Sequence, residues 1–134
     1  MKKIIYFLVA ISIWSCHSDN KRPSTAMETG TTFIKASMDG DFKTAEMLLL
    51  PDAENNQLFN AYQQYYNRMP EDKKNHYQSA SYKINNYNDF NDSTVIINYS
   101  NDYMNKPMEI KIIKSKGIWS VDFKYTYTGN LPIK

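Results

Sequence analysis

The sequence predicts an α+β domain, in which N-terminal helices pack on one face of a curved four-stranded antiparallel sheet. Up to residue 78, apolar residues recur three and four positions apart, which is the spacing of one helix face. After Gln78 the spacing changes to two, and β-branched and aromatic residues become frequent. A run of helices followed by a run of strands is typical of α+β domains, and no helical segment separates the strands as a parallel fold would require.

The first two helices are expected over residues 27–38 and from residue 42 to about residue 49. Phe33, Ile34 and Met38 share one face of the first helix. Gly40 suits the left-handed position that ends a helix, and Asp41 is a good N-cap for the next one. Pro51 then stops the second helix.

The third helix has the clearest apolar face in the sequence, which extends over three turns. Its members are Leu58, Ala61, Tyr62, Tyr65, Tyr66 and Met69. Pro70 marks a new helix start, and a short polar turn is expected over residues 73–77.

Four strands are expected in the second half, near residues 81–84, 94–99, 108–112 and 119–127. Asn91-Asp92 and Ser115-Lys116-Gly117 are typical turn sequences between them. In the last strand, apolar residues alternate with polar ones from Trp119 to Tyr127, which predicts one buried and one exposed face.

The N-terminal residues have the order of a secretory signal peptide. Lys2 and Lys3 precede an apolar run from Ile4 to Trp14, and the single cysteine, Cys16, follows. The segment resembles a bacterial lipoprotein signal, which implies lipidation of Cys16 after removal of residues 1–15. An ordinary signal peptide and an uncleaved anchor are the alternatives. We expect residues 16–26 to form a lipidated, flexible tether and residues 27–134 to form the domain.

Charge excludes one class of partner. Without Lys2 and Lys3, basic and acidic residues balance at 14 each, so no basic face predicts nucleic-acid binding. The partners expected are the membrane, through the lipid anchor, and a small amphipathic ligand or a protein. The expected location is the cell envelope, on the periplasmic or the surface side of a bacterial membrane.

Two motifs resemble the nuclear-transport-factor-2-like superfamily of cystatin-like, cone-shaped α+β domains. The first is the stretch over residues 32–45, with an aromatic residue, a Gly40-Asp41 break, and then Phe42 and Ala45. The second is Gly117-Ile118-Trp119-Ser120-Val121, which is similar to the family's hairpin exit. The resemblance implies a small envelope lipoprotein whose domain has no assigned function, and it brings no catalytic residue with it.

No catalytic site, metal site or cofactor is predicted. His76 stands without a second ligand or an orienting partner, so we expect a solvated turn histidine. Glu109 and Asp122 are out of phase with the apolar residues of their strands, so both should face solvent or a side of the sheet without helices, without the raised pKa that a general acid needs.

Aromatic side chains are the candidate binding residues. Rings with hydroxyl tips suit an amphipathic ligand, although aromatic residues at helical spacing more often fill the core between helices and sheet. The leading hypothesis is a non-enzymatic module that binds a small ligand or a protein. An enzyme acting on a hydrophobic substrate and a structural or adaptor module using the sheet face are the alternatives. The candidate pocket residues are Tyr62, Tyr65, Tyr66, Trp119, Phe123 and Tyr125.

Overall fold

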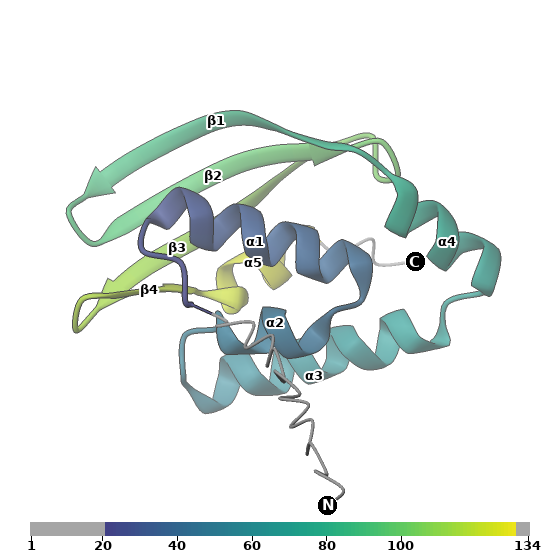
Figure 1. Ribbon diagram of the computed structural model, residues 1–134, viewed down its shortest axis with the longest axis horizontal. Helices are drawn as coiled ribbons and strands as arrows, with labels where there is room; N and C mark the ends of the chain where they lie inside the picture. Colours follow the sequence, from purple (N-terminus) through teal and green to yellow (C-terminus); the bar gives the residue numbers. More distant parts are fainter. Residues whose placement is uncertain (1–20, 131–134) are drawn as a thin grey trace, which may run out of the picture.

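The computed structural model describes residues 21–130, with side chains described as far as Thr126, and confirms the α+β class. Four antiparallel strands form an open sheet in the order β1-β2-β3-β4, and α1 lies across one face of it (Figure 1). The elements are α1 (Ala26–Asp39), α2 (Phe42–Met47), α3 (Ala53–Arg68), α4 (Glu71–Ser79), β1 (Tyr82–Asn91), β2 (Thr94–Asn101), β3 (Pro107–Ser115), β4 (Ile118–Val121) and α5 (Phe123–Asn130).

The junction of α1 and α2 has the predicted caps. Gly40 ends α1 with a φ of 75°, and the Asp41 side chain accepts a hydrogen bond from the Thr44 backbone N–H. A Cβ atom at position 40 would also lie 2.8 Å from the Tyr66 hydroxyl oxygen of α3. Glycine is therefore favoured at this turn for two reasons: it adopts the left-handed backbone conformation easily, and it leaves room for the Tyr66 side chain of α3.

The core lies between α1 and the inner face of the sheet. Val95, Ile97, Ile110 and Ile112 alternate inward from β2 and β3 and are almost fully buried. A Cβ atom on Gly30 of α1 would lie 2.5 Å from Ile97 Cδ1, so this glycine lets the helix approach the sheet closely. Rings from α1, α2, α3 and α5 complete the core above β3 and β4; they are Phe33, Phe42, Phe59 and Phe123.

The prediction of a last strand reaching Tyr127 is wrong beyond Val121. The backbone of Val121 hydrogen-bonds the segment after α2, donating to Leu48 O and accepting from Leu50 N, and the chain then turns into α5. The buried Asn55 side chain accepts a hydrogen bond from Lys124 N at 2.8 Å, within the first turn of α5. This tertiary cap favours a helix although residues 123–127 alternate like a strand, because alternation measures packing rather than a backbone preference.

Three smaller expectations also differ from the structure. The polar turn predicted after Pro70 is a nine-residue helix, α4. The predicted tether overlaps α1, which begins at the buried Ala26, and Arg22 donates a hydrogen bond to Ser120 Oγ at 2.8 Å. Trp119 packs only partly on the core, at the edge strand β4, with Lys114 over its ring. Cys16 and the signal segment lie outside the described residues.

Candidate functional site

An aromatic cavity lies at the end of the sheet where β2 ends and β3 begins. Its volume is about 80 Å³, and it is partly open to solvent. Four helices, two strands and one loop line it, since α1, α3, α4 and α5 meet β2, β3 and the loop between these strands there. The lining residues are Phe33, Ser37, Tyr62, Tyr65, Tyr66, Met69, Tyr77, Tyr99, Tyr103, Met104, Met108, Phe123 and Thr126.

Four of the six residues predicted to line a pocket meet at this cavity, namely Tyr62, Tyr65, Tyr66 and Phe123. Trp119 and Tyr125 do not line it. Trp119 lies on β4, away from the cavity, and Tyr125 is 36% exposed and hydrogen-bonds Glu109 on β3. Both were placed with Phe123 because the predicted strand aligned them on one face, and α5 removes that alignment.

Three tyrosine hydroxyls of the cavity wall are neutral, and two of them, those of Tyr62 and Tyr77, are hydrogen-bonded. The Tyr62 hydroxyl lies 3.4 Å from that of Tyr77 and donates to Ser37 O at 3.3 Å. Burial raises the pKa of Tyr62, Tyr77 and Tyr99 above the usual value of 10.0, because it disfavours the charged phenolate. These three hydroxyls therefore stay protonated at neutral pH.

Two hydroxyls in the cavity wall have no partner. Ser37 Oγ on α1 and Thr126 Oγ1 on α5 are buried and make no hydrogen bond in the structure. Their residues are 7% and 8% exposed, and both line the cavity. A buried hydroxyl without a partner costs roughly 1–3 kcal/mol, so such groups are uncommon in folded proteins. These two hydroxyls give the mainly aromatic wall buried hydrogen-bonding capacity that the protein itself does not use.

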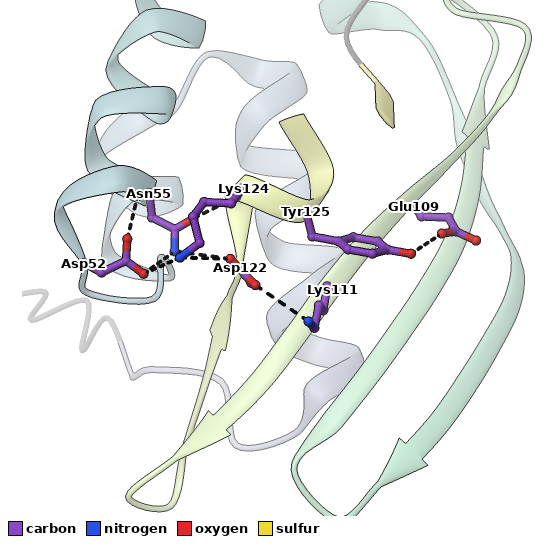
Figure 2. Close-up of polar contacts among 7 residues, drawn as sticks. All are labelled: Asp52, Asn55, Glu109, Lys111, Asp122, Lys124 and Tyr125. Carbon is purple, nitrogen blue, oxygen red and sulfur yellow. Dashed lines mark hydrogen bonds and ion pairs between the residues drawn. The ribbon is translucent and has the colours of Figure 1, made fainter. Parts of the chain in front are cut away.

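A polar cluster at the start of α5 fixes the helix that closes the cavity. Figure 2 shows Lys124 reaching Asp52, at 2.8 Å, and Asp122, at 3.6 Å, while Lys111 of β3 lies 3.9 Å from Asp122. The fully buried Asn55 connects the same groups, because its Nδ2 donates to Asp52 Oδ2 at 2.8 Å. The cluster ties α3 and β3 to α5, so that Phe123 and Thr126 are held at the cavity.

Asp122 is not the solvent-facing strand residue that the sequence predicted. It is 8% exposed, and it is buried because the chain turns from β4 into α5 at this point. Glu109 is partly buried rather than free in solvent, and its Oε2 accepts a hydrogen bond of 2.6 Å from the Tyr125 hydroxyl. Neither carboxylate lines the cavity.

The cluster predicts a specific acid sensitivity at Asp52. The hydrogen bond from Lys124, helped by the Asn55 backbone N–H, holds the pKa of Asp52 below its usual value of 3.8. A lowered folded-state pKa adds stability that is present above the unfolded pKa and is lost as the pH falls through the folded one. Asp52→Asn keeps a good helix cap and removes the charge. We expect it to be less stable than the wild type near neutral pH, with the difference shrinking below about pH 4.

Thermal unfolding of both proteins between pH 7 and pH 2 measures this effect. A difference in melting temperature that stays constant across the range would contradict the assigned role of the Asp52 charge.

His76, the remaining sequence candidate, does not line the cavity itself. His76 is exposed on α4, where its ring packs edge-on against Tyr103 at 5.3 Å between centroids. Within residues 21–130, no three His, Cys, Asp or Glu side chains gather as a metal site would require. The same part of the chain contains no helix long and apolar enough to cross a membrane.

Sequence reasoning missed several lining residues. Tyr99 and Met108 alternate inward with the core residues of their strands, so their inward direction could have been predicted. Ser37 lies one helical turn after Phe33, on the same face of α1, and its spacing was the available signal. Thr126 had no signal, because its segment was predicted as a strand.

The fold and the site define an open-sheet α+β domain with a small aromatic cavity between its helices and the ends of β2 and β3. Comparisons of this chain with models of known protein families, with curated proteins and with solved structures give no match. The resemblance to the nuclear-transport-factor-2-like superfamily therefore stays a prediction.

Proposed function

We propose that this domain is a binding module for a small, mainly apolar molecule with one hydrogen-bonding end, and that a lipid on Cys16 anchors it to a bacterial membrane. The observation that carries the binding proposal is the pair of unpartnered hydroxyls, Ser37 Oγ and Thr126 Oγ1, in the wall of an aromatic cavity. A ligand hydroxyl or amide placed between them would recover hydrogen bonds that folding leaves unmade.

The dimensions of the cavity limit the shape of the ligand. An apolar cavity of roughly 150 Å³ accommodates a benzene ring, and this one measures about 80 Å³. A narrow chain fits better than a ring system. Because the cavity is partly open, the rest of such a chain can extend past Tyr65, which is 50% exposed, and past Met104 on the loop between β2 and β3.

The chemistry of the wall favours binding over catalysis. The described lining consists of aromatic, methionine and hydroxyl side chains and includes no carboxylate, lysine or histidine. A general acid or base must lie within hydrogen-bond reach of the reacting group, and the groups most often used in that role, carboxylates and imidazoles, are missing from the described lining. These features support a binding module over the enzyme alternative.

Titration with 1-hexanol, followed by NMR of isotopically labelled methionine methyl groups, tests the binding site. Met69, Met104 and Met108 line the cavity, whereas Met27, Met38 and Met47 do not and serve as internal controls. We expect saturable shifts at the three lining methyl groups and none at the controls. Shifts that never saturate, or that appear equally at Met47, would contradict the proposal.

The two orphan hydroxyls also predict variants that stabilise the free domain. Ser37→Ala removes an unpartnered buried hydroxyl, and Thr126→Val replaces one by a methyl group of similar size. Each is expected to raise the free energy of unfolding by about 1 kcal/mol, since the desolvation cost of the hydroxyl disappears. Urea denaturation measures this change in the free energy of unfolding. Ser79→Ala, at an exposed position on α4, is the control. A loss of stability in both variants would mean that the hydroxyls have partners in the free protein.

The anchor is tested separately. Metabolic labelling with a fatty-acid probe is expected to mark the wild type and not Cys16→Ser, and the variant should leave the membrane fraction. An unlabelled wild type, together with a variant that stays in the membrane fraction, would refute lipidation without bearing on the cavity.

A further inference from the structure

We infer that the domain lies on the bilayer through one surface, formed by the exposed Lys21, Met47, Lys114, Lys116 and Ile118, with the aromatic cavity at the far end of the sheet. This inference rests on the proposed lipid anchor at Cys16. We call these five residues the membrane-facing surface.

The first step is the place where the tether joins the domain. The Arg22 guanidinium donates hydrogen bonds to Met47 O at the end of α2, to Trp119 O at 3.3 Å and to Ser120 Oγ at 2.8 Å. One side chain thus fixes the start of the described chain between α2 and β4, and Figure 1 shows this start beside β4.

The second step is the reach of the chain. Arg22 lies six positions after Cys16 in the sequence, and a fully extended chain covers at most about 3.6 Å per residue. Arg22 therefore lies within roughly 20 Å of the lipid-bearing residue in any conformation. The domain cannot move far from the bilayer, so the surface around Arg22 stays close to lipid.

The third step is the chemistry of that surface. Met47 and Ile118 are 43% and 48% exposed, and they belong to the few large apolar side chains that the described part of the domain leaves in solvent. Lys114 lies over the Trp119 ring at 5.5 Å, and Lys116 occupies the turn that leads to Ile118. Exposed apolar side chains and lysines at one end of the sheet suit the interface of a bilayer that contains anionic lipids, where each nearby lysine contributes about 1 kcal/mol.

The fourth step concerns the cavity. Arg22 hydrogen-bonds Ser120 of β4, which pairs with Ile113 of β3. The cavity is lined by Met108, which also belongs to β3. Ile113 and Met108 are five positions apart along β3, which is roughly 17 Å at the usual strand rise. The cavity therefore lies at the end of the sheet away from the bilayer, so its ligand would arrive from the aqueous compartment rather than from the lipid.

The test uses the mature, lipidated full chain in vesicles of phosphatidylethanolamine and phosphatidylglycerol that contain nitroxide-labelled lipid. An environment-sensitive fluorophore is attached to Met47→Cys, to Ile118→Cys or to Asn75→Cys, which is exposed on α4 beside the cavity. We expect the first two labels to be quenched several-fold more strongly than the third. Lys114→Glu combined with Lys116→Glu should reduce quenching at position 118 in these vesicles but not in phosphatidylcholine vesicles.

Equal quenching at all three positions, or stronger quenching at position 75, would overturn the inference and leave the anchor intact. If Cys16 itself reacts with the fluorophore and no fatty acid is found on the chain, the anchor fails, and the membrane-facing surface fails with it.

Discussion

Replacing Phe59 with alanine is expected to lower the free energy of unfolding by about 3–5 kcal/mol, the range for a large aromatic residue removed from a packed core. Phe59 is 1% exposed on α3. Its ring lies 5.9 Å from that of Phe33 on α1 and 5.4 Å from that of Phe123 on α5. The variant should therefore loosen three helices at once, α1, α3 and α5, all of which line the cavity.

Phe90→Ala is the matched control for this prediction. It removes the same side chain from a position on β1 that is 65% exposed, so a change of less than about 1 kcal/mol is expected. Urea denaturation of both variants gives the comparison. Equal losses in the two would show that Phe59 is not the centre of the helical core.

Asn55→Ala is expected to cost about 2–4 kcal/mol, because it leaves several buried polar groups without a partner. The Asn55 side chain accepts from Lys124 N at 2.8 Å and donates to Asp52 Oδ2 at 2.8 Å and to Asp122 Oδ1 at 3.4 Å. Without the Asn55 side chain, the first turn of α5 should become less ordered, and Thr126 should no longer be held at the cavity. We therefore also expect weaker binding of 1-hexanol, although Asn55 does not line the cavity.

Hydrogen exchange locates that effect. Amides of α5 should exchange faster in Asn55→Ala than in the wild type, while those in the middle of β2 should follow only the global loss of stability. Asn56→Ala, at the next and exposed position of α3, should change neither quantity. Unchanged exchange in α5 would contradict the role of Asn55 as the cap of this helix.

Local chemistry made most of the fold predictable. Gly40 and Asp41 mark the break between α1 and α2 by residue type alone, and the turns at Asn91-Asp92 and Ser115-Lys116-Gly117 define the hairpins. The failure at α5 has a tertiary cause. Residues 123–127 alternate like a strand, and the helix depends on Asn55, which lies 69 positions from Lys124 in the sequence.

The candidate site was predictable where it depends on one regular element. The apolar face of α3 brought Tyr62, Tyr65 and Tyr66 together because helical spacing does so by itself. The two orphan hydroxyls depend on how α1 and α5 meet across the core. No local pattern in the sequence distinguishes Ser37 or Thr126 from other small polar residues.

The relative affinity for 1-hexanol and 1-chlorohexane tests the central claim most directly, because the two molecules share a chain and differ in the hydroxyl group. NMR titration of the methionine methyl groups gives both dissociation constants. We expect the wild type to prefer 1-hexanol, and the double variant Ser37→Ala, Thr126→Val to prefer the more apolar 1-chlorohexane. A wild type that binds 1-chlorohexane more tightly, or a preference that the double variant keeps, would contradict the proposal that these two hydroxyls recognise a ligand.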